Sequence, residues 1–148
     1  MTVFRVERGT PLPVAEAWRR VTDWGAHGAG VPLTRVTVLT AGPTGAGTRF
    51  TARTGLGRLG FDDPMRVVRW EPPGTGGSAA GVCRLEKEGR VVLGAAEITV
   101  RAEGSGARVT WVEELRVRGV PRWCDPLLNH AARWVFGREV DRLLGGVA

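Results

Sequence analysis

The chain has 148 residues, of which 43% are hydrophobic, and carries a formal net charge of +6. This length suits one globular domain that buries a core without disulfides or metals, so we expect a single domain over residues 1–148. No apolar stretch reaches the about 20 residues that a membrane-spanning helix needs, and the N-terminus lacks the apolar run of a signal peptide. We therefore expect a cytoplasmic protein with no membrane span.

The positive charge comes almost entirely from arginine, because Lys87 is the only lysine. The arginines are scattered along the chain, and only Arg19 and Arg20 are adjacent. No basic run or helix face is apparent that would follow a phosphate backbone, so we expect no nucleic-acid partner. The two cysteines, Cys83 and Cys124, are too few for a disulfide framework and are expected to be free thiols.

The first half of the chain predicts a strand, a helix and two further strands. Residues 2–8 alternate between apolar and charged side chains, which indicates a strand with Phe4 and Val6 facing the core. Residues 14–24 have helical spacing and follow a proline, which is tolerated in the first turn of a helix. The glycine-rich stretch over residues 25–33 is expected to be a mobile loop. Residues 34–41 and 48–54 predict the next two strands.

The second half predicts four more strands and a long final helix. Residues 55–64 are expected to form a connection, and strands are predicted over 65–71, 81–88, 90–101 and 107–117. Short glycine-containing turns force such strands into an antiparallel meander. Residues 121–144 follow as an amphipathic helix, which must bury its apolar stripe on the sheet. The stripe consists of Leu128, Ala132, Val135, Phe136, Val140 and Leu143. The predicted fold class is α+β.

One carboxylate falls on the apolar face of its strand. In residues 107–117, Glu113 shares a face with Trp111 and Leu115, whereas Glu114 and Arg116 face the other way. An ionised carboxylate on a core face is costly unless it is paired, hydrogen-bonded or wetted by a cavity. Glu113 is therefore the leading candidate for a functional carboxylate.

Other motifs give weaker signals. Residues 55–60 match the pattern GxGxxG, but no helix follows to hold a pyrophosphate, so we interpret the stretch as a hairpin connection. The two histidines, His27 and His130, have no metal-ligand spacing. Cys83 has no base near it in sequence and is interpreted as a small core residue. We expect no metal and no cofactor.

The order of elements resembles the helix-grip fold of the SRPBCC superfamily, which includes START domains, pollen-allergen-like proteins and polyketide cyclase/dehydrase-like proteins. The resemblance is carried by residues 4–36, 65–73, 83–100 and 106–115 together with the final helix. It implies a curved antiparallel sheet of about seven strands wrapped around a long C-terminal helix, with short helices after the first strand. It also implies a hydrophobic cavity between sheet and helix that binds an apolar small molecule such as a lipid or polyketide.

Few functional residues carry over from the superfamily. The residues Asp23, Trp24, His27 and 32–34 fall in the loop that would close the cavity. Aromatase/cyclases of the superfamily are thought to use arginine, tyrosine and water as proton carriers, and this chain has no tyrosine. The available substitutes are His27, Glu113 and an inward-facing arginine, which would be Arg66 if it shares a face with Val68 and Trp70.

Three hypotheses follow. In the first, the chain binds an apolar small molecule, and His27 and Glu113 orient it. In the second, it is a polyketide cyclase or dehydratase, with Glu113 as general base and His27 as acid. In the third, it is an interaction domain with a closed core, in which Glu113 is paired to an arginine. A monomer or a homodimer fits each of them. The predicted binding residues are Trp24, His27, Phe50, Leu85, Trp111, Glu113, Leu128 and Val135.

Overall fold

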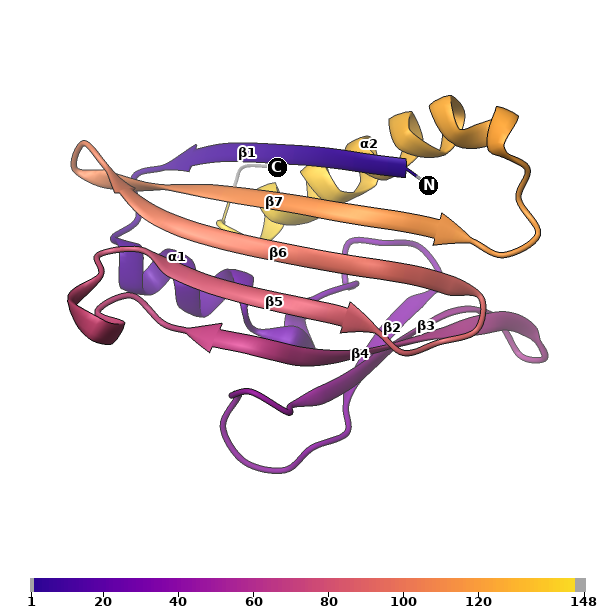
Figure 1. Cartoon of the computed structure of the whole chain (residues 1–148), viewed down its shortest axis with the longest axis horizontal. Coiled ribbons are helices and arrows are strands. Elements are labelled where there is room, and N and C mark those ends of the chain that lie inside the picture. Colours follow the sequence, from indigo (N-terminus) through magenta and orange to yellow (C-terminus); the bar gives the residue numbers. More distant parts are fainter. Residues whose placement is uncertain (1, 146–148) are drawn as a thin grey trace.

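The computed structural model describes residues 2–145 and has the predicted α+β architecture, a seven-stranded antiparallel sheet with a long C-terminal helix (Figure 1). The strands are β1 Thr2–Thr10, β2 Thr34–Val38, β3 Arg49–Leu56, β4 Leu59–Glu71, β5 Gly81–Lys87, β6 Val92–Glu103 and β7 Gly106–Val117. The helices are α1 Val14–Val21 and α2 Asp125–Leu143, with short 3-10 turns at Trp24–Ala26, Thr75–Gly77 and Arg122–Cys124.

The sheet order is β1-β7-β6-β5-β4-β3-β2. Strands β2 to β7 are neighbours in chain order, which confirms the predicted meander. Strand β1 pairs with β7 and forms one edge of the sheet, and β2 forms the other. In Figure 1 strands β1, β7, β6 and β5 follow one another from the top of the view downwards. The alternation of side chains places Phe4, Val6, Leu85 and Trp111 in the core, with 2%, 5%, 2% and 4% exposed surface.

The β3–β4 hairpin is longer than the sequence suggested. Residues 55–64 were expected to be a connection, but β3 runs to Leu56 and β4 starts at Leu59, with Leu56 opposite Leu59. The glycines make this tight turn possible, because a Cβ on Gly55 would lie 2.2 Å from the carbonyl oxygen of Leu59. The GxGxxG stretch is thus a hairpin, as predicted, and Asp62 and Asp63 belong to a strand.

A β-bulge between Val67 and Arg69 breaks the alternation in β4. Residue Val67 is fully buried, so its neighbour Arg66 faces outward, and the expectation of an inward Arg66 is wrong. The guanidinium of Arg66 lies 3.7 Å from Glu86 and 3.8 Å from Glu88 on the outer face of the sheet. A bulge re-aims side chains in this way because one extra residue shifts the strand's register.

Both helices are shorter than predicted. Helix α1 ends at Val21, and the chain continues into the 3-10 turn that carries Trp24. Helix α2 begins at Asp125, with Pro126 in its first turn, where a missing N–H costs nothing. Its inner face includes Ala132, Val140 and Leu143, which are buried. None of the helices among residues 2–145 is both long enough and apolar enough to cross a membrane.

Candidate functional site

A pocket of about 280 Å³ lies between the inner face of the sheet and α2. Its walls come from β2 to β7, from α2 and from the segment that follows α1. Of the eight predicted binding residues, Leu128 does not line this pocket but packs against the core. The other seven do line it, namely Trp24, His27, Phe50, Leu85, Trp111, Glu113 and Val135. Their roles in binding stay predictions.

Aromatic rings make up much of the pocket wall. Trp24 stacks on Phe50 with ring centroids 4.6 Å apart and an interplanar angle of 10°. The ring centroid of Trp111 lies 5.5 Å from that of Phe136 of α2 and 5.6 Å from that of His27. Such tilted and offset contacts are the preferred geometries of aromatic pairs and add to the stabilisation from burial. The wall is therefore fixed by ring-to-ring packing and presents flat apolar surfaces.

His27 joins this wall as a neutral imidazole. Its Nε2 lies 2.8 Å from the carbonyl oxygen of Val21, so Nε2 carries the proton and donates it. Burial lowers the pKa of His27, which keeps the ring uncharged at neutral pH. In this tautomer Nδ1 is an acceptor, and it makes no hydrogen bond within residues 2–145. His27 lies in the stretch that was expected to be a mobile loop, but its ring packs against Trp24 and Trp111.

Three charged side chains form a buried cluster at one wall of the pocket. Lys87 Nζ lies 2.7 Å from Asp63 Oδ2 and 3.3 Å from Glu113 Oε1. Trp111 donates its indole N–H to Glu113 Oε2 at 3.0 Å. The side chains of Lys87 and Glu113 are only 4% and 2% exposed. Glu113 is thus paired, but to a lysine and not to the arginine that the closed-core hypothesis expected.

The ionisation of this cluster is set by burial. Burial raises the pKa of Glu113 and of Asp63, and the attraction of Lys87 offsets only part of this effect. For Lys87, burial opposes the charged form, but the two carboxylates outweigh it and raise the pKa of the ammonium. Lys87 is therefore a cation at neutral pH and a poor nucleophile, whereas Glu113 and Asp63 hold protons more readily than they would in water.

A second polar group, Glu139 of α2, lines the pocket and was not predicted from the sequence. It accepts a hydrogen bond from the Gly28 backbone N–H at 2.8 Å and pairs with Arg142 at 2.6 Å. Arg142 also donates to the carbonyl oxygen of Ala26. Burial opposes ionisation of Glu139, but its bonds to Arg142 and Gly28 outweigh this and lower its pKa. Part of the loop predicted to be mobile is thus tied to α2.

The remaining candidates do not add chemistry to the site. Burial raises the pKa of the Cys83 thiol to about 12, so it is no nucleophile at neutral pH. Both Cys83 and Cys124 are free, as predicted. Within residues 2–145, no group of histidine, cysteine, aspartate or glutamate side chains is arranged to hold a metal ion.

Comparison with solved structures shows the fold. TTHA0849 from Thermus thermophilus superposes with a TM-score of 0.67 at 18% identity, over 97% of this chain and 92% of that one. One di-domain ARO/CYC, BexL from the BE-7585A biosynthetic pathway, has a TM-score of 0.67 at 14% identity, over 99% of this chain and 46% of that one. A norcoclaurine synthase point mutant from Thalictrum flavum has a TM-score of 0.65 at 12% identity, over 97% and 94%.

The chain has the helix-grip fold. The fold that the resemblance to the SRPBCC superfamily implied is thereby confirmed. No family model matches the chain, and no curated protein matches it in sequence. At identities this low the likeness concerns the fold and not the ligand. The single domain, the cytoplasmic location, the oligomeric state and the absence of a nucleic-acid partner stay predictions.

The buried cluster gives a stability prediction. Replacing Lys87 by methionine leaves two carboxyls without their cation, and breaking a buried pair in this way costs about 3–5 kcal/mol. Both carboxyls have raised pKa values in the folded chain, so they destabilise it increasingly as the pH rises above their ordinary values. Lys87→Met should therefore lose more free energy of unfolding at pH 8 than at pH 5, measured by urea denaturation.

The control for this experiment is the double variant Lys87→Met/Glu113→Gln. It removes one of the stranded charges and should recover part of the lost stability at pH 8. A single variant as stable as the wild type, or a loss that is the same at both pH values, would contradict the assignment of a buried charge cluster.

The link between α2 and the loop gives a second prediction. Glu139→Ala removes the acceptor of the Gly28 N–H, and a hydrogen bond to a charged group is worth about 1.5–3 kcal/mol. Hydrogen exchange of the Gly28 amide should accelerate roughly tenfold to a hundredfold. Asp141→Ala is the control, because it removes another carboxylate of α2, one that pairs with Arg8 of β1 and not with the loop. It should leave exchange at Gly28 unchanged. Unchanged exchange at Gly28 in Glu139→Ala would exclude this role.

Proposed function

We propose that the chain binds an apolar small molecule in the pocket between the sheet and α2. The observation that carries the proposal is the pocket itself, a space of about 280 Å³ walled by Trp24, Phe50, Trp111 and Phe136. Its volume lies just below the about 300–1,000 Å³ typical of small-molecule sites, which suits a small ligand. A helix-grip protein with a filled core would leave no such space.

The polar groups around the pocket are engaged mainly with one another. Lys87 is held by Asp63 and Glu113, and Glu139 is held by Arg142 and the Gly28 N–H. The walls left for a ligand are therefore mostly apolar, which favours a flat hydrophobic molecule. Three polar atoms of the lining have no hydrogen-bond partner among residues 2–145: the acceptors Nδ1 of His27 and Oδ1 of Asp63, and the donor Nε1 of Trp24. They suit one hydroxyl or N–H of the ligand. In this account Glu113 acts indirectly, because it fixes the orientation of the Trp111 indole.

Filling the pocket tests this proposal. Val135 lines the pocket from α2, so Val135→Phe should weaken binding of the neutral fluorescent probe N-phenyl-1-naphthylamine at least about tenfold, since the added ring occupies the ligand's space. Val3→Phe makes the same change on the outer surface, where Val3 is 55% exposed, and should bind like the wild type. Equal binding by both variants, or none by the wild type, would contradict the proposal.

A second candidate function is polyketide cyclase or dehydratase activity in the same pocket. It rests on the arrangement of Glu113 and His27 around Trp111, because the indole N–H bonds to Glu113 while His27 packs against the ring. The raised pKa of Glu113 suits a general base. The neutral His27 has an unprotonated Nδ1, which accepts a proton and does not fit the role of acid that the sequence predicted. One of the structural neighbours is, by its description, an ARO/CYC protein.

This candidate makes a separate prediction. Glu113→Gln should lower the rate of conversion of a substrate in host extract about a hundredfold or more, the usual contribution of a general base. Conversion is followed by mass spectrometry, with folding checked by thermal denaturation. Glu114→Gln, one residue along and facing away from the pocket, is the matched control. Extract processed equally well by both variants would exclude catalysis by Glu113.

A further inference from the structure

The outer face of α2 carries large apolar side chains that nothing covers within residues 2–145. Trp123, Leu127 and Trp134 are 82%, 72% and 59% exposed. They follow one another at steps of four and seven residues, so they lie along one side of the helix and the 3-10 turn before it. We call these three residues the outer ridge. Contiguous exposed apolar side chains of this size mark interaction surfaces more often than scattered ones do.

Three arginines lie close to the outer ridge in the sequence. Arg122, Arg133 and Arg138 are exposed, and none of them forms an ion pair within the described part of the chain. The guanidinium of Arg138 lies over the Trp134 ring at 4.8 Å from its centroid. Their charge is therefore available to an external partner, in contrast to that of Arg8, which is paired with Asp141.

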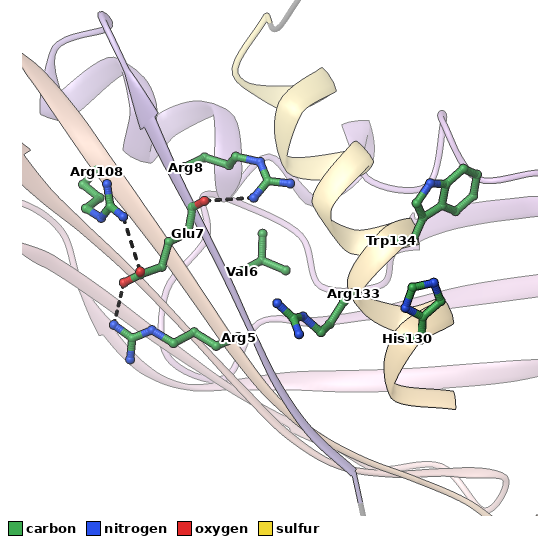
Figure 2. Close-up of a pocket in the computed structure, with 8 residues that line it drawn as sticks. All are labelled: Arg5, Val6, Glu7, Arg8, Arg108, His130, Arg133 and Trp134. Atoms are coloured by element: carbon green, nitrogen blue, oxygen red, sulfur yellow. Dashed lines mark hydrogen bonds and ion pairs between the residues drawn. The ribbon is translucent and has the colours of Figure 1, made fainter. Parts of the chain in front are cut away.

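A basic groove borders the outer ridge (Figure 2). It lies between edge strand β1 and α2, with Arg5, Arg8 and Arg108 on the sheet side and Arg133 on the helix side. Glu7 lines the groove and is bonded to Arg5 and Arg108. Arg108 also pairs with Glu103, and Arg8 pairs with Asp141. Arg133 is therefore the groove arginine without an ion pair in the described part of the chain, and its charge adds to that of Arg122 and Arg138. Trp134 belongs to both the groove and the outer ridge, so the two features form one continuous surface.

We propose that this surface docks the protein onto a bilayer that contains anionic phospholipids. Tryptophan and leucine favour the boundary between headgroups and acyl chains, and arginines beside them contact the phosphates while their stems lie along apolar surface. Such a surface binds in the plane of the interface and needs no membrane-spanning helix. This role is independent of what the pocket binds.

Charge and shape favour a bilayer over other occupants. A second copy of this chain seated on the outer ridge would bring together two surfaces that both carry exposed arginines, and like charges across an interface are unfavourable. A protein partner would have to provide a groove for the protruding Trp123 and Leu127 side chains. A bilayer accepts protruding apolar side chains without a preformed groove, and its phosphates complement the arginines.

The test is sedimentation of the full chain with vesicles. The protein should bind vesicles of phosphatidylcholine and phosphatidylglycerol in equal parts, bind pure phosphatidylcholine vesicles much more weakly, and be released as ionic strength rises. Leu127→Ser and Trp134→Ser should each weaken binding about tenfold. Arg133→Gln should weaken it about fivefold.

Matched controls separate the surface from general effects of charge and hydrophobicity. Leu59→Ser removes a leucine that is 82% exposed on the β3–β4 hairpin, and Arg101→Gln removes an exposed charge from β6. Both should bind vesicles like the wild type. Soluble glycerophosphate at matched ionic strength should not compete.

Several results would overturn the proposal. One is that the protein does not bind anionic vesicles at low salt. Another is that it binds neutral and anionic vesicles equally well, and a third is that the outer-ridge variants bind anionic vesicles like the wild type. Full competition by glycerophosphate would assign the groove to a free anion. A dimer in size-exclusion chromatography that Leu127→Ser dissociates, without vesicle binding, would make the ridge a self-interface.

Discussion

The pairing of Lys87 with Glu113 and Asp63 is the interaction on which the pocket depends. A carboxylate on the inner face of β7 is tolerable only because the chain's single lysine reaches it from β5. Glu113 in turn accepts the Trp111 N–H and so fixes the ring that separates the charged cluster from His27. Buried ion pairs add little net stability compared with apolar packing. We therefore interpret this cluster mainly by how it holds Trp111 in the pocket wall.

A second set of contacts holds the other side of the pocket. Glu139 and Arg142 of α2 bind the backbone at Gly28 and Ala26, and Trp24 stacks on Phe50. The loop therefore depends on the end of α2, the helix whose inner face also supplies Val135 and Phe136. One helix thus provides a pocket wall, an anchor for the loop and, on its opposite face, the outer ridge.

Much of the fold follows from alternation and turn residues, which predicted the meander, the buried Phe4 and Val6, and Glu113 on the inner face. The failures have physical causes. The bulge at Val67 turned Arg66 outward, and the β3–β4 hairpin extended through Asp63 because glycine permits its tight turn. Lys87 and Glu139 were detectable, since Lys87 continues the alternation of Cys83 and Leu85 and Glu139 lies on the apolar stripe of α2. The partners of Lys87 and Glu139 could not be predicted. Which strands lie opposite each other, and which loop backbone meets α2, depends on strand register and tertiary packing, and the sequence pattern shows neither.

The most direct test of the central claim, that the pocket holds an apolar molecule, is native mass spectrometry of the protein purified from its own host, followed by organic extraction. The account predicts a bound molecule of one defined mass that is extracted into organic solvent and is lost in Val135→Phe. A protein that carries no such molecule and also fails to bind an apolar dye would contradict it and would leave the pocket without a ligand.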